Sequence, residues 1–347
     1  MTLPEIDTTY LLDFLTGLLN TPSPTGMAEA GILYTEQALS AMGIPAQRTH
    51  KGGLLASLDG QLASAPRAMT AHVDTLGAMV KAIKPNGRLK LTQLGGYAWN
   101  SIEGEGCTVF TAGGHKIRGS ILLDKASVHI YGKKVSETPR DEEVIEVRID
   151  ERTGSQEQTR ALGIEVGDFV SFDPRVEVVN GFVRSRHLDD KACVACILAA
   201  VKALHEAGLQ PVQTTHLFFS NYEETGHGAA AGIPAGCVEL LTVDMAAAGE
   251  GQNSDEYHAS LCVKDSGGPY HHGMSQRLRH LAGENDIDYR VDVYPYYGSD
   301  GESLWRAGGD LAVALIGPGV DASHSYERTH LDALVATARW ILAYLLN

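Results

Sequence analysis

The apolar and polar positions of the chain follow three successive patterns. Residues 7–43 carry apolar side chains at helical spacing, which predicts two helices separated by the breaker "PSPTG". Residues 76–184 instead contain short alternating runs such as "CTVFTA" and "GDFVSFD" between glycines, which is typical of strands. From about residue 185, strand and helix patterns alternate up to an amphipathic helix expected at 331–346. These patterns therefore predict an α/β protein with an inserted β-rich segment.

These patterns divide the chain into two expected domains. Strands that alternate with helices imply a mostly parallel sheet covered on both faces. We expect this α/β domain over residues 1–75 and 185–347, and a small inserted all-β domain over 76–184. The insertion should contain a hairpin at 79–96, because Asn86-Gly87 is a strong turn signal between two alternating runs.

Composition and charge limit the classes of binding partner that the chain can have. The formal net charge is −15, which disfavours nucleic acid and anionic membranes as partners. We expect no membrane span and no signal peptide, because the chain lacks an 18-residue apolar run and its first residues are acidic rather than basic. A cytoplasmic location is therefore the expectation. The cysteine pair Cys193 and Cys196 lies in a helical pattern, so core packing is favoured over a redox or zinc site.

Ionisable side chains cluster just after several predicted strands. Ligands of open α/β sheets bind beyond the carboxyl ends of the strands, so these residues should converge at one edge. Each alone has an ordinary explanation as a helix cap or a solvated turn. The residues are His72, Asp74, Asp189, Asp190, Glu223, Glu224, Asp244, His324 and Glu327.

This combination of imidazoles and carboxylates indicates a metal site. Such ligands suit zinc, cobalt or manganese. Two divalent ions would balance the four carboxylates of Asp189, Glu223, Glu224 and Asp244, which otherwise repel one another. One of the adjacent glutamates could bind metal while the other handles the proton of a metal-activated water. The arrangement is that of a hydrolase.

The motifs resemble those of a known family in order and approximate spacing. "AHVDTLG", "LDDKACVACIL", "NYEETGHGAA", "LTVDM" and "ASHSYE" are similar to the signatures of the co-catalytic zinc aminopeptidases of metallopeptidase family 42. The resemblance covers nearly the whole chain. It implies a phosphopeptidase-like α/β/α sandwich with an inserted β-barrel used in dimerisation, peptide substrates, and dimers that commonly build a hollow tetrahedral dodecamer.

The resemblance also implies a role for each site residue. Asp189 would bridge two metal ions, most often zinc. His72 and Asp244 would complete the ligands of one ion, and Glu224 and His324 those of the other. Glu223 would be the general base that activates the water shared by both ions, and Asp74 would hold the second nitrogen of His72.

The chain departs from the family pattern in two places. Asp190 and Lys191 stand where Asn-Arg commonly follows the bridging aspartate. Ser299 replaces the threonine usual before Asp300. Neither departure removes an expected ligand, so we expect them to affect the surroundings of the bridging residue or the substrate preference.

Three other functions remain open at this stage. An endoglucanase would need two carboxyl groups and no metal, so it leaves His72 and His324 unexplained. A dipeptidase or amide deacylase of the same fold would act on small acylated peptides, and blocking the free amine of the substrate would separate it from an aminopeptidase. A non-catalytic scaffold would be expected to have lost ligands, whereas this chain keeps them all.

Overall fold

The computed structural model describes residues 2–347 and divides into two compact units. The larger unit contains the residues up to Thr75 together with Arg175–Asn347, and the smaller unit is Leu76–Pro174. Residue 1, part of the expected 1–75 segment, lies outside the described residues. The smaller unit ends at Pro174 and not at 184, because the following strands belong to the larger unit: β10 (Glu177–Val179) pairs with β11 (Phe182–Ser185), and β11 pairs with β18 (Glu327–His330).

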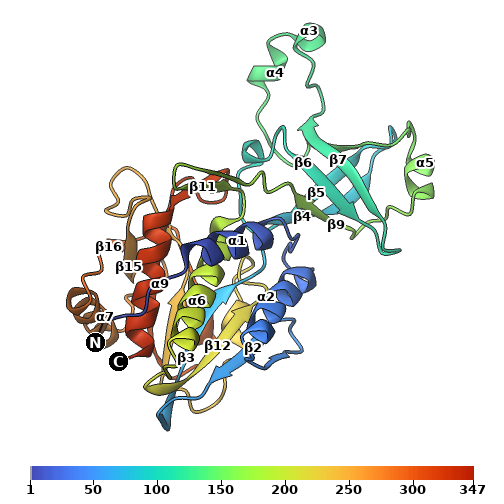
Figure 1. Cartoon of the computed structure of the whole chain (residues 1–347). Helices are drawn as coiled ribbons and strands as arrows, with labels where there is room; N and C mark the ends of the chain where they lie inside the picture. The colour runs from blue at the N-terminus through green and yellow to red at the C-terminus, as the bar shows by residue number, and fades with distance from the viewer. Residues whose placement is uncertain (1) are drawn as a thin grey trace. The chain divides into compact units, whose positions relative to one another are not determined.

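The described part of the larger unit is built on a nine-stranded sheet (Figure 1). Its strands are β1 (Ala46–Arg48), β2 (Leu54–Leu58), β3 (Leu62–His72), β12 (Gln213–Ser220), β13 (Glu239–Val243), β14 (Ala246–Ala247), β15 (Ala259–Lys264), β16 (Tyr289–Val293) and β17 (Ala312–Val320). They lie in the order β1-β2-β12-β3-β13-β17-β15-β16, and β14 pairs with β17. The central strands β12, β3, β13 and β17 are mutually parallel, so their carboxyl ends lie at one edge.

The central strands are buried on both faces. Met69 of β3 and Leu241 of β13 belong to the core beneath one layer of helices, whereas their neighbours Ala68 and Leu240 belong to a second core on the opposite face. Successive residues of a strand point to opposite faces, so continuous apolar runs are required here. The sheet is therefore enclosed on both sides, as the sequence predicted.

Helices of the larger unit cover this sheet. They are α1 (Thr8–Leu19), α2 (Glu29–Ala41), α6 (Leu188–Glu206), α7 (His272–Glu284), α8 (Asp300–Arg306) and α9 (Leu331–Leu345), with a 3₁₀ turn η2 (Gly228–Ala230). Helix α6 packs between α1 and α9 against β3 (Figure 1). Cys193 and Cys196 of α6 are buried and free, which agrees with a packing role. None of the helices in residues 2–347 combines the length and the apolar composition needed to cross a membrane.

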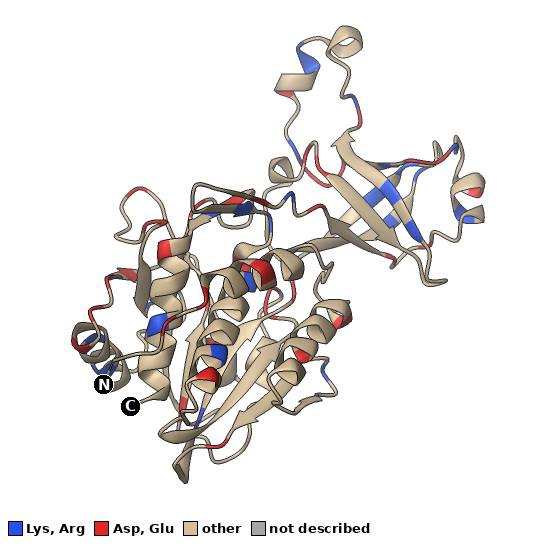
Figure 2. Cartoon of the chain, in the orientation of Figure 1, with Lys and Arg blue, Asp and Glu red and all other residues tan. Residues whose placement is uncertain are grey.

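The smaller unit contains a closed barrel in the order β4-β5-β8-β7-β6-β9. Its elements are β4 (Gly77–Ile83), β5 (Leu89–Leu94), η1 (Trp99–Ser101), β6 (Gly106–Phe110), β7 (Lys116–Leu123), α3 (Val128–Tyr131), α4 (Lys134–Glu137), β8 (Ile145–Ile149), α5 (Gln156–Ala161) and β9 (Phe169–Phe172). The predicted hairpin is present, and Gly87 at its tip has a positive φ of 82°. Figure 2 shows basic residues on the barrel strands. Arg118 of β7 forms an ion pair with Asp173. The barrel has an apolar core of its own.

Candidate metal centre

Four adjacent parallel strands deliver side chains to one edge of the large sheet. His72 is the last residue of β3, and Asp244 immediately follows β13. Glu223 and Glu224 follow the end of β12, and His324 lies shortly beyond the end of β17. Because these strands are neighbours in the order β12-β3-β13-β17, their ends meet in space although they are distant in sequence.

Asp189 and Asp190 reach the same region from the first turn of α6. Both have non-helical backbone angles, and the peptide bond between them is cis. The strand that precedes them, β11, belongs to the separate three-stranded sheet β10-β11-β18. The sequence pattern had predicted that these ionisable residues all follow strands of one sheet. The position of Asp189 is instead set by the start of a helix.

Asp189 lies between two histidines. Its Oδ1 is 3.0 Å from His72 Nε2, and its Oδ2 is 3.3 Å from His324 Nε2. Glu224 Oε2 lies 3.7 Å from the same nitrogen of His324. Asp189, Glu224 and His324 each offer a ligand atom within 4.8 Å of the others. Each oxygen of Asp189 thus faces a different imidazole, which is the placement that a bridging carboxylate requires.

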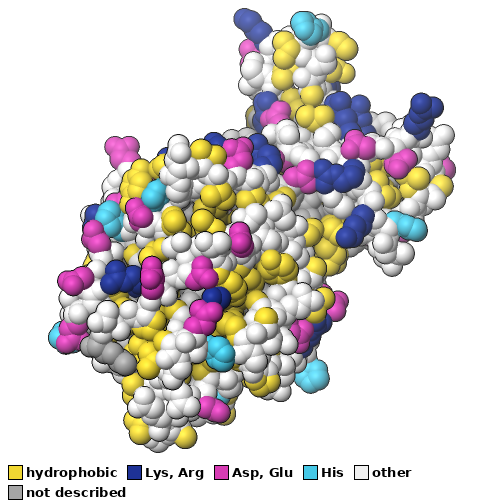
Figure 3. All heavy atoms as spheres, in the orientation of Figure 1, with side chains coloured by type: hydrophobic (Ala, Val, Ile, Leu, Met, Phe, Trp, Pro, Cys, Tyr) yellow, Lys and Arg dark blue, Asp and Glu magenta, His cyan; other side chains and the backbone are white. Residues whose placement is uncertain are grey.

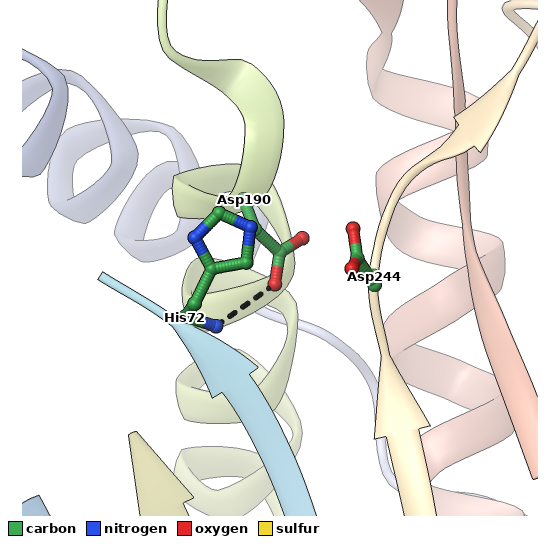
Figure 4. Close-up of side chains that lie close together, drawn as sticks. All are labelled: His72, Asp190 and Asp244. Atoms are coloured by element: carbon green, nitrogen blue, oxygen red, sulfur yellow. Dashed lines mark hydrogen bonds between the residues drawn. The ribbon is translucent and has the colours of Figure 1, made fainter. Parts of the chain in front are cut away.

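A second group consists of His72, Asp190 and Asp244 (Figure 4). Their ligand atoms also lie within 4.8 Å of one another, and all three residues are buried. Oδ2 of Asp190 accepts a hydrogen bond from the backbone N–H of His72 at 3.1 Å. Asp190 was not expected to be a ligand from the sequence, because the resemblance assigned the bridging role to its neighbour.

Asp74 supports the centre through the backbone of the paired glutamates. Its Oδ1 accepts the N–H of Glu223 at 3.2 Å and its Oδ2 the N–H of Glu224 at 3.4 Å, and the hydroxyl of Thr25 donates to it at 2.7 Å. Nδ1 of His72 lies 2.8 Å from the backbone carbonyl oxygen of Asp74 and 3.7 Å from its carboxylate. The imidazole therefore has its nearest partner in the main chain of Asp74.

Glu327 holds two parts of the centre together. Its Oε2 accepts the N–H of Asp189 at 3.1 Å, and its Oε1 accepts the N–H of His324 at 3.0 Å. The side chain is fully buried. His324 has a positive φ of 64°, which is uncommon for a residue other than glycine, and this clamp helps to define its backbone. Glu327 comes three residues after His324, and that spacing is the only sequence signal for the role.

Asp300 at the start of α8 connects two of the strand ends. Its Oδ2 accepts hydrogen bonds from the hydroxyls of Thr70 in β3 at 3.0 Å and Ser220 in β12 at 2.5 Å. Its Oδ1 accepts the N–H of Ala229 at 2.6 Å. Thr70 and Ser220 lie shortly before His72 and Glu223, so Asp300 positions the segments that carry these residues.

The electrostatics of the centre favour bound cations. Burial, reinforced by neighbouring carboxylates, raises the pKa of Asp244 to about 7 and that of Glu224 to about 8. Burial also raises the pKa of Glu223 well above its usual range. For His72, burial lowers the pKa, but the hydrogen bond to Asp189 and the surrounding carboxylates outweigh it, so the net pKa is well above normal. Positive charge is thus strongly stabilised at this position.

The donor set fits divalent transition metals. Two imidazoles and several carboxylates, grouped within coordination reach, match the ligand types of zinc, cobalt and manganese. The centre opens onto a cavity of about 460 Å³ whose lining includes Asp189, Glu223, Glu224, Asp244 and His324. A small molecule in this cavity would contact the proposed ions and the proposed base together.

We expect the metal-free chain to lose thermal stability as the pH rises from 5 to 7. Asp244 and Glu224 have raised pKa values in the folded chain, so their protons stabilise the fold at low pH, and this contribution is lost as the pH rises through those values. Melting temperatures in a chelator would test this, and excess zinc should raise them most near pH 7. The prediction is limited to pH values up to 7 because burial lowers the pKa of Lys191 to about 7. Above that pH, the buried Lys191 is neutral, and its contribution to the stability of the fold increases with pH. A melting temperature that is insensitive to both pH and zinc would contradict the expectation.

Comparison with known proteins gives consistent matches over the chain. The model of the family described as M42 glutamyl aminopeptidase matches residues 52–340. YhfE of Bacillus subtilis (strain 168), which is named as a candidate aminopeptidase, is 48% identical over 334 residues, 96% of each chain.

Two solved structures share the fold. An aminopeptidase from the archaeon Desulfurococcus kamchatkensis has a TM-score of 0.87 at 19% identity and covers 97% of this chain and 95% of its own. The Pyrococcus horikoshii TET1 peptidase, described as able to assemble into a tetrahedron or a large octahedral shell, has a TM-score of 0.84 at 20% identity, with coverages of 97% and 99%. With the family model spanning most of its length and a relative at 48% identity, the chain belongs to the M42 glutamyl aminopeptidase family of peptidases.

Proposed function

We propose that this chain is a dinuclear metal-dependent aminopeptidase that removes N-terminal residues from peptides. The observation that carries the proposal is the position of Asp189, whose two carboxylate oxygens each face a different histidine. Family membership supports the peptidase chemistry. The cavity of about 460 Å³ beside the centre gives a peptide terminus access to it.

The ligands divide into two sets that share Asp189. His72 and Asp244 would hold one ion, and Glu224 and His324 the other. When bound, such ions polarise a peptide carbonyl and lower the pKa of water toward neutrality. We propose zinc as the native metal, with cobalt and manganese as alternatives that the same ligands accommodate.

Glu223 is placed to move the proton. Its Oε2 lies 3.7 Å from Nε2 of His72, and its side chain lines the cavity. Asp74 fixes its backbone N–H, so the carboxylate is held at the edge of the proposed ion pair. Burial raises its pKa, which suits a group that accepts a proton from the attacking water and returns it to the leaving amine.

The cavity favours an N-terminal residue over a blocked terminus. In the metal-loaded centre at its base, the free amine of a peptide would lie near one of the two ions. Met245 and Tyr297 give the adjacent wall apolar surface, and Arg306 is a charged residue in the lining beyond the proposed ligands and base. A free amine would therefore bind at the acidic end, and the first side chain would lie against Met245 and Tyr297.

We propose that the barrel unit makes dimers, which could assemble further into a tetrahedral dodecamer. Val128 and Ile130 of α3 are 62% and 75% exposed, and Figure 3 shows apolar atoms on the surface of this segment. Residues 125–134 include three lysines and no acidic residue, whereas the whole chain has a net charge of −15. Apolar exposure together with this opposite charge suits contact with a second, acidic copy of the chain. A cytoplasmic location remains part of the proposal.

Replacing the proposed base tests the chemistry. Glu223→Gln should reduce kcat by roughly 10²–10⁴-fold while both metal ions stay bound, because the amide keeps the shape but cannot take a proton. Metal content measured beside turnover of an aminoacyl chromogenic substrate would check this. Glu206→Gln, at the exposed end of α6, is the matched control and should behave as wild type. Near-normal turnover of Glu223→Gln would show that another group is the base.

Blocking the substrate amine distinguishes an aminopeptidase from an amide deacylase. We expect cleavage of peptides with a free N-terminus and little cleavage of their N-acetylated forms, because acetylation removes the basic amine that would lie near one of the ions. Paired free and acetylated peptides of two to six residues, assayed with zinc, cobalt and manganese, give the measurement. Preference for acetylated substrates, or cleavage restricted to dipeptides, would favour the deacylase or dipeptidase alternative.

In this proposal, the α3 segment forms the contact that holds the oligomer together. Ile130→Asp should shift the chain to smaller assemblies, because it places a charge in the apolar contact between copies. Light scattering coupled to size-exclusion chromatography would report the mass. Leu62→Asp, at a position 51% exposed in the larger unit, is the control and should leave the mass unchanged. An unchanged mass for Ile130→Asp would exclude this segment from the interface.

A further inference from the structure

We propose that Asp190 is an additional ligand of the ion held by His72 and Asp244, so that this half of the centre carries one more carboxylate than the other. The inference rests on the two-ion centre of the proposed function. It concerns a residue that the resemblance to the family did not assign to metal binding.

The carboxylate of Asp190 has one oxygen engaged and one oxygen free. Oδ2 accepts the backbone N–H of His72 at 3.1 Å. Within residues 2–347, no group donates a hydrogen bond of ordinary geometry to Oδ1, although the side chain is fully buried. The weakly donating thiol of Cys193 lies beside this carboxyl. A buried carboxylate oxygen without a strong donor is costly unless a cation offsets its charge.

The free oxygen is directed into the His72–Asp244 group. Figure 4 shows the oxygen of Asp190 that is not bonded to His72 pointing toward Asp244. The ligand atoms of His72, Asp190 and Asp244 all lie within 4.8 Å of one another. Atoms at this mutual spacing can bind one ion at ordinary zinc–oxygen and zinc–nitrogen distances of about 2.0–2.2 Å after small adjustments.

A ligand at Asp190 makes the two halves of the centre unequal. With Asp189 shared, the first ion would have His72, Asp190 and Asp244, all of them buried. The second ion would have Glu224 and His324, which are only partly buried. Additional negative charge and lower exposure both favour tighter binding. The chain should therefore bind divalent ions in two distinct steps.

Asp190→Asn tests the inference with minimal change of shape. The amide oxygen can still accept the N–H of His72, whereas the anionic oxygen is lost. We expect the tighter step in a zinc titration by calorimetry to weaken by on the order of 10-fold or more, and the absorption spectrum of the cobalt-loaded chain to change. Asp168→Asn is the control. Asp168 is a buried aspartate of the barrel unit that accepts backbone N–H groups, and its replacement should leave both metal-binding steps unaltered.

The outcomes separate this inference from the proposed function. If wild type binds two ions and cleaves peptides, but Asp190→Asn binds zinc as wild type does with an unchanged cobalt spectrum, Asp190 is not a ligand. If wild type itself binds fewer than two ions, the proposed function fails instead. Should the variant not fold, a crystal of the cobalt-loaded wild type decides. Oδ1 at about 2.0–2.2 Å from the ion supports the inference, and Oδ1 outside coordination distance overturns it.

Discussion

Repulsion between buried carboxylates is the constraint on which the rest of this structure depends. Two negative charges 4 Å apart cost about 4 kcal/mol at the effective dielectric near a protein surface. The centre collects Asp189, Asp190, Glu223, Glu224 and Asp244 at one edge of the sheet, and burial together with the neighbouring carboxylates raises the pKa values of Glu224 and Asp244. Such a cluster is stable in its ionised form only beside cations. The proposed two-ion chemistry follows from that requirement.

Two further carboxylates at this edge accept hydrogen bonds from backbone N–H groups. Asp74 accepts N–H groups of Glu223 and Glu224, and Glu327 accepts those of Asp189 and His324. These N–H groups offset part of the cost of burying each carboxylate, although burial still raises the pKa of both Asp74 and Glu327 above the usual range. These residues fix the loops so that the proposed ligands keep their geometry. The acidic residues at this edge thus divide into those that face cations and those that hold the main chain.

Much of this organisation could be predicted because parallel strands end at one edge of a sheet. Ionisable residues that follow an apolar run were predicted to converge at this edge. The structure brings together four of them, namely His72, Glu223, Asp244 and His324. The barrel was recognised from its alternating runs and glycine punctuation. Strand β15 pairs antiparallel with β17 and parallel with β16, and it was missed because this pairing is set by tertiary contacts. The barrel boundary was placed late for the same reason, since β10 pairs with β11 and β11 pairs with the distant β18.

The contacts made by the supporting residues could not be predicted from the sequence. Asp300 acts through hydroxyls of Thr70 and Ser220, and those contacts join segments far apart in the chain. Asp74 was expected to hold His72 through its carboxylate, but the carbonyl oxygen of the same residue lies closer, at 2.8 Å. Asp190 adjoins the expected bridging residue, and only its unpaired oxygen marks it. Short-range patterns locate such residues, but atomic contacts define their roles.

The separate apolar core of the barrel has an evolutionary consequence. Residues Leu76–Pro174 are stabilised by their own buried cluster, and the proposed ligands and base all come from outside that segment. Substitutions that reshape the barrel core would therefore leave the packing under the metal ligands untouched. Lineages could diversify how copies of the chain associate while the chemistry stays constant, and an engineer could exchange the barrel as a module.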